Sequence, residues 1–138
     1  NLPNLRPARR IDLSDPARQW GDGERARPGA LAAIFCANVI HIAPWAVAEG
    51  LFAGARNHLK PGGFLFLYGP FKRDGAHTAP SNEAFDQSLR AQDAAWGVRD
   101  MADVEALATQ QGLSRIDCVT MPANNFTLIF EKIDASAR

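Results

Sequence analysis

Residues 31–71 read LAAIFCANVIHIAPWAVAEGLFAGARNHLKPGGFLFLYGPF and have the pattern of a strand, a helix and a second strand. The run Leu31–Cys36 is short, apolar and without alternation, which is typical of a central strand with both faces covered. Phe64–Tyr68 has the same character. A strand, a crossover helix and a strand normally form a right-handed parallel unit, so both strands should end at one edge of a sheet, where such sheets bind ligands.

The segment between these strands is predicted to be an amphipathic helix of about four turns. Pro44 stands where a helix tolerates proline, in the first turn. Lys60–Gly63, which contains a proline and two glycines, should end the helix in a turn. The apolar residues recur at spacings of three and four, with Val47 and Leu51 beside them: Trp45, Ala48, Phe52, Ala55 and Leu59.

Length and composition indicate one domain with a real core in a chain of 138 residues. Lys plus Arg and Asp plus Glu both number 15, so no net charge attracts nucleic acid or an anionic membrane. No apolar run is long enough to span a bilayer and no signal-peptide pattern is present, which predicts a cytoplasmic protein. Cys36 and Cys118 lie in apolar runs without metal-ligand spacing, and we expect buried free thiols.

The residues before this unit give weaker signals. A short strand is possible at Arg9–Leu13, and Ser14–Ala30 has the composition of a loop. Gly21–Gly23 does not have the setting of a phosphate-binding loop, because no strand precedes it and no helix follows.

The residues after it begin with a polar loop, Gly69–Ser81, punctuated by glycine and proline. Ser81 is the predicted N-cap of a helix that runs to about Ala95. The apolar residues expected on one side of this helix are Phe85, Leu89 and Trp96.

The last third of the chain predicts a helix and a hairpin. Asp100 should cap the helix and Gly112 should end it. Arg115–Met121 and Phe126–Ile133 are the expected strands, and the four residues between them are too few for a crossover, so the pair must be antiparallel. If the first of them runs parallel to Phe64–Tyr68, three polar loops meet at one edge of the sheet.

This order of elements resembles the second half of class I S-adenosylmethionine-dependent methyltransferases. Leu59–Gly63 is similar to the turn before their fifth strand. The segments ANVIHIAPWAVAEGLFAGA, LKPGGFLFLYGPFKRDGAHTAPSN, WGVRD and MPANN resemble the methyltransferase-like protein 26 family. The resemblance implies an α/β fold, the C-terminal portion of a Rossmann-like sheet of parallel strands with a C-terminal antiparallel hairpin.

The sequence departs from that pattern in one respect. Class I methyltransferases carry an acidic, glycine-rich loop after the first strand and an acid at the end of the second, and residues 1–138 contain neither. By the resemblance, they form one partial domain that begins just before the third strand. We therefore expect weak or no binding of S-adenosylmethionine by this chain, and an exposed edge on Leu31–Cys36 that favours self-association.

The resemblance suggests roles for residues near the first loop. Asn38 and His41 lie where the reacting methyl group is placed, although Asn38 could simply stabilise its turn and His41 could be a buried structural imidazole. Asp12 could correspond to the acid that often follows strand three near the adenine, although a single Asp after an Ile is common. Trp45 could stack on an adenine, or belong to the core.

Substrate contacts are expected from the other two loops. Lys72 and Arg73 could bind a carboxylate or phosphate, although a solvated charge pair is the commoner reason for such residues. The remaining candidates are Tyr68 and His77, with Thr78 beside them, and the turn residues Asn124 and Asn125.

The function predicted from sequence is thus a methyltransferase-like protein with an unknown small-molecule or protein acceptor, inactive as this chain alone. The alternative is a non-catalytic binding module of the same fold. A dehydrogenase-type nucleotide enzyme is a weaker reading, since it also needs a glycine-rich loop.

Overall fold

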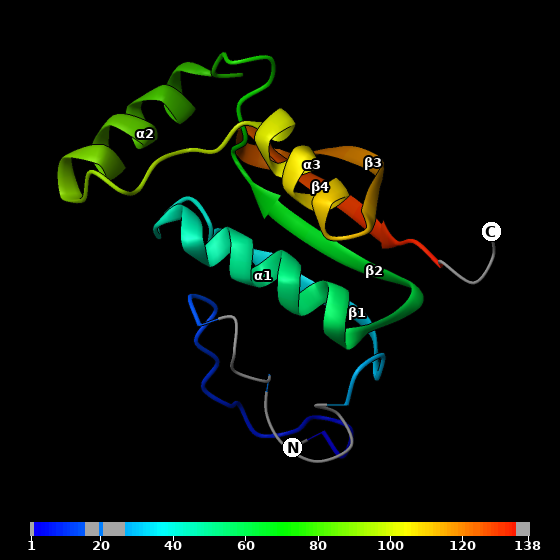
Figure 1. The fold of residues 1–138 in the computed structure, drawn as a ribbon. Coiled ribbons are helices and arrows are strands. Elements are labelled where there is room, and N and C mark those ends of the chain that lie inside the picture. The colour runs from blue at the N-terminus through cyan, green and yellow to red at the C-terminus, as the bar shows by residue number, and fades with distance from the viewer. Residues whose placement is uncertain (1, 16–19, 21–26, 135–138) are drawn as a thin grey trace.

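The structure, a computed structural model, describes residues 2–15, 20 and 27–134. It contains one sheet, with helices on one of its faces (Figure 1). The elements in chain order are β1 (Leu31–Ala37), α1 (Trp45–His58), β2 (Leu59–Gly69), α2 (Pro80–Gln92), α3 (Met101–Gln110), β3 (Leu113–Met121), a 3-10 turn η2 (Pro122–Asn124) and β4 (Asn125–Lys132).

The four strands have the order β1-β2-β4-β3. β1 is parallel to β2, whereas β4 is antiparallel to both β2 and β3, so β3 runs in the same direction as β1 and β2. The predicted parallel unit, the C-terminal hairpin and the direction of its first strand are therefore confirmed. As a result, β1, β2 and β3 all end at the same edge of the sheet.

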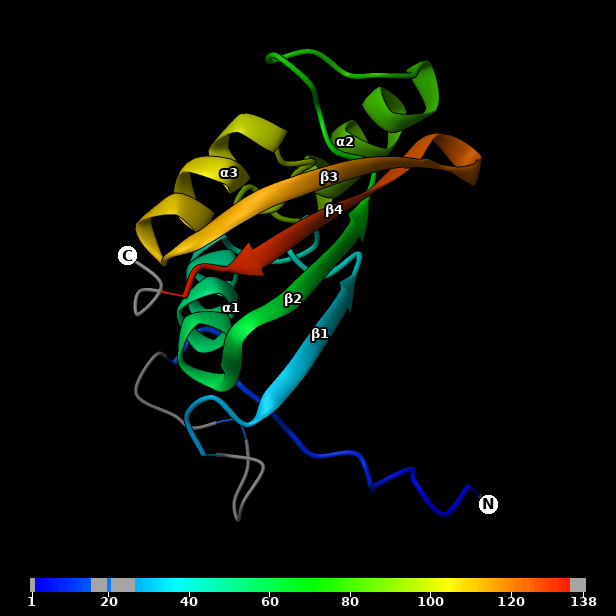
Figure 2. The same cartoon turned by 90° about the vertical axis from the view of Figure 1, so that its right-hand side faces the viewer.

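The hydrophobic core lies on one face of this sheet, under α1 and α3 (Figure 2). Alternate residues of the two middle strands, among them Leu65, Leu67 and Leu128, point to this side and are fully buried. Phe52 of α1 meets Phe130 of β4 edge to face, with ring centroids 5.2 Å apart. The apolar stripe predicted for α1 thus packs as expected, except that its last member, Leu59, is buried as the first residue of β2.

The cap predicted for α3 is confirmed, whereas the start and the buried face predicted for α2 are wrong in part. Asp100 caps α3 as predicted, since its carboxylate accepts a hydrogen bond from the Ala102 amide at 2.8 Å. α2 begins two residues earlier than predicted, because its N-cap is Ala79 rather than Ser81 and Pro80 occupies its first turn, where proline is tolerated. The predicted apolar stripe of α2 was wrong at Phe85, which is exposed, while Asn82 and Asp86 are buried beside Leu89.

Two strand predictions need correction. The described residues 2–15 form no strand, so the one expected at Arg9–Leu13 is wrong. β1 is an edge strand and Phe35 is 68% exposed, since no described element covers its second face. Gly21–Gly23 lies outside the described residues.

The two cysteines, Cys36 of β1 and Cys118 of β3, are free, as expected, but they are half-buried rather than buried. Burial raises the pKa of the Cys36 thiol to about 11. Cys36 is therefore protonated and a poor nucleophile at neutral pH. In the described part of the chain, no helix has the length and apolar character needed to cross a membrane.

Among the described residues, β1 pairs only with β2, so its outer edge has free backbone donors and acceptors. The sequence of β1, LAAIFCA, contains no charge that would prevent edge pairing. We therefore expect a second copy of the chain to pair with this edge, and light scattering at high concentration should give at least a dimeric mass.

The variant Phe35→Lys should shift this mass toward the monomer, because it places a charge on the pairing strand. Leu5→Lys, at another exposed apolar position, is the matched control and should leave the mass unchanged. A monomeric wild-type chain at high concentration would rule out the edge pairing.

Candidate functional site

A cavity of about 530 Å³ lies at the edge of the sheet where β1 and β2 end. It is formed by the loop after β1, the residue after β2, the first turns of α2 and the η2 turn. This is the convergence of loops that the sequence predicts. The lining residues are Asn38, Ile42, Pro70, Ser81, Asn82, Phe85, Ala123 and Asn125.

Asn38 joins the first two of these loops. Its backbone has a positive φ of 56°, a left-handed conformation that asparagine adopts more readily than most residues. Its amide N–H donates to the Tyr68 carbonyl at 2.9 Å, which extends the β1–β2 pairing by one bond. The turn residue Ala123, across the cavity, also has a positive φ, of 60°. Backbone conformations that few residues adopt therefore shape both sides of the cavity.

His41 lies in the same loop, three residues after Asn38, and is only 1% exposed. Its Nδ1 accepts a hydrogen bond from the backbone N–H of Arg99 at 3.0 Å, so the neutral ring carries its hydrogen on Nε2. Nε2 is buried and has no hydrogen-bond partner. The ring also meets Phe71 edge to face, with centroids 4.8 Å apart.

The pKa of His41 is lowered to about 3, mainly by burial and also by the nearby Arg99 guanidinium, while Asp86 opposes the shift. The imidazole is therefore neutral near pH 7. With Nδ1 already bonded and the hydrogen on Nε2, the ring offers a donor rather than a base in this conformation.

Gly69, at the end of β2, allows the His41 ring to lie where it does. A Cβ at Gly69 would come 2.4 Å from His41 Nε2 and 2.9 Å from Cδ2. We expect Gly69→Ala to lower the free energy of unfolding by about 1–2 kcal/mol, because the ring must shift in a packed interior. Chemical denaturation measures this.

The control for this prediction is the same substitution in a His41→Ala background, where the ring that the new Cβ would meet is absent. If crowding at His41 matters, His41→Ala should remove most of the cost of Gly69→Ala. Additive effects in the double mutant would contradict this explanation.

A second cavity, of about 360 Å³, lies on the other side of the loop after β1. Asp12 is exposed at this cavity, and its Oδ1 accepts from the Ser14 amide at 3.0 Å and the Ser14 hydroxyl at 2.6 Å. The loop residues 38 and 39 therefore separate two cavities. The second is lined by Arg10, Ile11, Asp12, Leu13, Val39, Ala43 and Val47.

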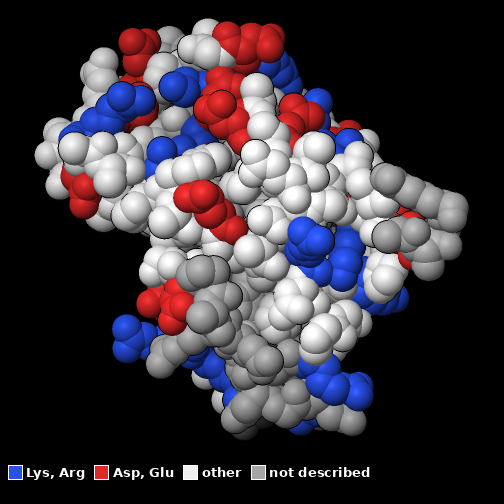
Figure 3. All heavy atoms as spheres, viewed as in Figure 1, with Lys and Arg blue, Asp and Glu red and all other residues white. Residues whose placement is uncertain are grey.

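Several predicted site residues lie elsewhere. Trp45 and Lys72 line a third cavity, of about 540 Å³, which α1 and α3 border, with the Arg99 guanidinium 5.4 Å above the Trp45 ring. Acidic and basic side chains alternate over this upper part of the molecule (Figure 3). Arg73 lies over the Phe126 ring at 5.1 Å, and His77 pairs with Asp86 at 3.3 Å.

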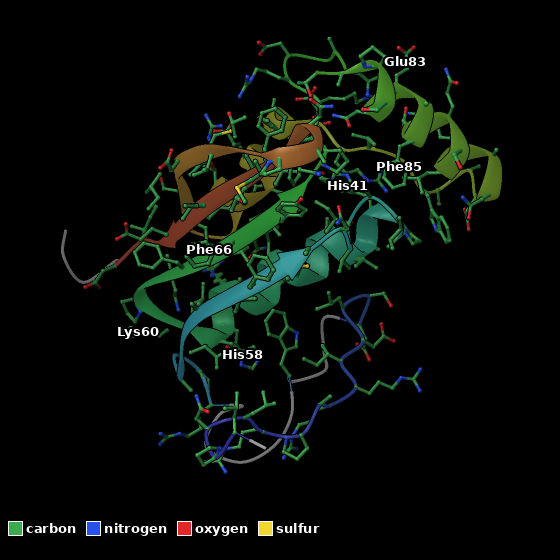
Figure 4. The ribbon with its side chains drawn as sticks, turned by 180° about the vertical axis from the view of Figure 1, so that it is seen from behind. His41, His58, Lys60, Phe66, Glu83 and Phe85 are labelled. Atoms are coloured by element: carbon green, nitrogen blue, oxygen red, sulfur yellow. The ribbon has the colours of Figure 1, made fainter. Side chains whose placement is uncertain are left out.

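The other predicted residues support the cavity at Asn38. Tyr68 supplies the carbonyl that holds the Asn38 amide, and Asn124 supplies one that accepts from Asn82 Nδ2 at 3.0 Å. Asn125 lines the cavity directly. The sequence reasoning missed Ile42, Phe85 and Asn82 as lining residues, since side-chain direction rather than residue type brings them there. Figure 4 shows Phe85 on the side of α2 toward the sheet end where His41 lies.

Residues 1–132 match the profile of a family described as "Protein of unknown function (DUF938)". Similar solved structures include an O-methyltransferase family protein from Burkholderia thailandensis, with a TM-score of 0.71 and 16% identity over 91% of this chain and 35% of that one. An O-methyltransferase family 2 protein from Planctomyces limnophilus, in complex with apigenin, has a TM-score of 0.67 and 19% identity over 89% of this chain and 33% of that one.

Human N-acetylserotonin methyltransferase in complex with SAM has a TM-score of 0.67 and 14% identity, over 91% of this chain and 33% of that one. At these identities the likeness shows the fold alone. The chain spans about a third of the length of the methyltransferases that it matches.

Proposed function

Because the chain belongs to the DUF938 family and has the fold of part of a methyltransferase, we propose that it forms the acceptor side of an S-adenosylmethionine-dependent methyltransferase site. The segments that resemble the methyltransferase-like protein 26 family support this proposal. They include the loop after β1 and the η2 turn, which both line the cavity at Asn38. We expect the acceptor to be a small molecule or an exposed protein side chain.

The observation that carries the proposal is the pair of cavities separated by the loop after β1. Val39 lines the cavity at Asp12, and its neighbour Asn38 lines the other one. A methyl-transfer site needs a donor space beside an acceptor space, because the donor carbon and the acceptor atom must be aligned, and here the adjacent residues 38 and 39 border one cavity each. The ends of parallel strands are where such sheets bind ligands.

The residues at the second cavity fit the adenine end of the cofactor. Ile11, Leu13, Val39 and Val47 offer apolar walls for a flat ring, and Asp12 offers a carboxylate among them. When bound, the cofactor supplies an electrophilic methyl group. This chain would contribute the adenine wall and the acceptor cavity, and the expected weak affinity follows from the lack of a glycine-rich loop in residues 1–138.

In this proposal the chain acts mainly by orientation. Asn38 would hold the acceptor atom, and His41 would fix the loop that carries Asn38, since it accepts from the Arg99 amide. Among the described residues that line the cavity, none is an acid or a base. The same observation favours the alternative, a non-catalytic module that binds a metabolite or peptide in this cavity.

Calorimetric titration of S-adenosylhomocysteine tests the proposal. The ligand is titrated into this chain and into a version extended upstream of residue 1 through the strands that precede this part in class I methyltransferases. We expect micromolar binding by the extended version and weak or no binding by the chain alone. Val47→Asp in the extended version should weaken binding at least about tenfold, because it puts a charge in the apolar wall.

The matched control is Val119→Asp, at an exposed position of β3. Binding by neither version would overturn the methyltransferase proposal and favour the binding module. Micromolar binding by the isolated chain would contradict the claim that it holds only part of the cofactor site.

A further inference from the structure

We propose that the cavity at Asn38 binds an uncharged, largely apolar small molecule that donates a hydrogen bond from a hydroxyl or N–H group. This inference rests on the proposed function only in treating that group as the methyl acceptor. It is carried by three properties of the lining residues: exposed apolar walls, spare hydrogen-bond acceptors and the absence of a counter-charge.

The apolar walls come from separate elements. Ile42, in the loop after β1, is 44% exposed, and Phe85, on α2, is 39% exposed. Both line the same cavity, together with Pro70 and Ala123. A ring bound between them would remove apolar surface from water on both sides, which is the main source of affinity for small ligands in such cavities.

Two of the four polar side chains that line the cavity, Asn82 and Asn125, use donors within the protein. Asn82 Nδ2 donates to Thr78 Oγ1 at 3.2 Å and to the Asn124 carbonyl at 3.0 Å. Asn125 Nδ2 donates to the carbonyls of Pro122 and Ala123, at 3.4 and 3.3 Å. The amide oxygens of both residues remain as acceptors. A ligand with a hydroxyl or N–H group can donate to these two oxygens.

The nearby cations are directed elsewhere. Arg73 lies over Phe126, with Nη2 3.6 Å from Cys118 Sγ, and Lys72 lines the third cavity. His77 pairs with Asp86. Among the described residues that line the cavity at Asn38, none is charged. An anionic ligand would therefore lose its hydration without gaining a counter-charge.

A pair of probes with the same ring system tests this inference: 2-naphthol, which is neutral at pH 7 and donates a hydrogen bond, and 2-naphthoate, which is anionic. Each is titrated into the ¹⁵N-labelled chain and followed by amide chemical shifts. We expect 2-naphthol to shift the signals of Asn38, Phe85 and Asn125, and 2-naphthoate to bind about tenfold more weakly or less.

Three variants sharpen the test. Phe85→Ser should weaken 2-naphthol binding severalfold, whereas Phe35→Ser, an exposed phenylalanine on the uncovered sheet face, should not. Ser81→Lys places a cation at the cavity and should reverse the preference, so that 2-naphthoate binds more tightly than 2-naphthol.

Equal binding of the two probes, no 2-naphthol binding at millimolar concentration, or shifts confined to the residues around Phe35 would each overturn the inference. The titration contains no cofactor, so its result is independent of the calorimetry with S-adenosylhomocysteine. If 2-naphthol binds at Asn38 and neither version binds S-adenosylhomocysteine, the proposed ligand class is supported and the proposed methyl transfer is contradicted.

Discussion

Lowering the pH from 7 to 5 is expected to reduce the free energy of unfolding by about 2 kcal/mol through His41 alone. The pKa of this imidazole is about 3 in the folded chain, mainly because burial disfavours its charged form, against an ordinary value near 6.5. The unfolded chain therefore binds more protons between these two values. The contribution of His41 is complete above about pH 6.5 and is lost as the pH falls toward 3.

Urea denaturation at several pH values measures this loss, and His41→Asn is the informative variant. An asparagine Oδ1 can replace Nδ1 as the acceptor for the Arg99 amide, but it does not titrate. We expect the variant to be less stable at pH 7 and to lose much less stability between pH 7 and 5. If both proteins lose the same amount, His41 is not the group responsible.

The buried His58 shifts in the same direction, since burial also lowers its pKa. It lies at the opposite end of the sheet from His41, stacked on Trp20 with centroids 5.0 Å apart (Figure 4). The variant His41→Asn should therefore retain a smaller pH dependence that comes from His58. The pKa of Asp86 is lowered by the hydrogen bonds it accepts from the Val98 amide and Arg90, which outweigh its desolvation, so it contributes only at more acidic pH.

The order of elements was predictable because it depends on local patterns. Apolar runs of strand length, a stripe at spacings of three and four, and a four-residue connection between the last strands suffice to give a parallel unit followed by an antiparallel hairpin. What these patterns cannot tell is which faces are covered. The apolar run of β1 can be buried on both faces, but in the described chain Phe35 is exposed.

The error at α2 has a different physical cause. Periodicity counts apolar residues, whereas two of the three buried positions of α2 are polar. Asp86 is buried because it accepts from the Val98 amide at 2.8 Å and lies 3.1 Å from Arg90 Nε. The Val98 amide lies outside α2, and a helical wheel counts no hydrogen bonds, so it assigns Phe85 to the core and Asp86 to solvent. The structure has the reverse.

For the candidate site, the sequence predicted the location but not the side chains that line it. The sequence indicated that three polar loops meet, and Asn38 and Asn125 do line one cavity. It could not tell where long side chains point. Lys72 and Trp45 follow the right strand and the right loop, yet both face the third cavity. Residue type and spacing fix the neighbourhood of a side chain, while its direction depends on packing with distant segments.

Arg99 joins two such distant segments, the loop after β1 and the residues before α3. Its Nε donates to the Ile40 carbonyl at 3.0 Å, and its Nη2 donates to the carbonyls of Ala43 and Ala95 at 2.7 and 2.9 Å. The guanidinium also stacks over Trp45. One side chain therefore satisfies backbone carbonyls in the loop that carries Asn38 and in the segment between α2 and α3.

Arg99→Ala is expected to lower the free energy of unfolding by about 3 kcal/mol, because it removes three charge-assisted hydrogen bonds and leaves the Ile40 carbonyl without this donor. Arg99→Lys should recover less than half of the loss, since an ammonium lacks the planar fork and stacks poorly on Trp45. Both variants should also weaken 2-naphthol binding, because the loop they loosen carries Asn38 and Ile42.

Arg90→Ala is the matched control for this prediction. Arg90 is exposed and makes an i,i+4 ion pair with the buried Asp86, which keeps the Val98 amide and His77 as partners, so the loss should cost about 1 kcal/mol. If Arg99→Ala costs no more than Arg90→Ala, the loop after β1 holds its shape without the guanidinium. The backbone bonds that join it to Tyr68 and Gly97 would then be sufficient to position Asn38. A cost near 3 kcal/mol with weakened 2-naphthol binding would instead make the third cavity, where Arg99 lies, structurally coupled to the cavity at Asn38.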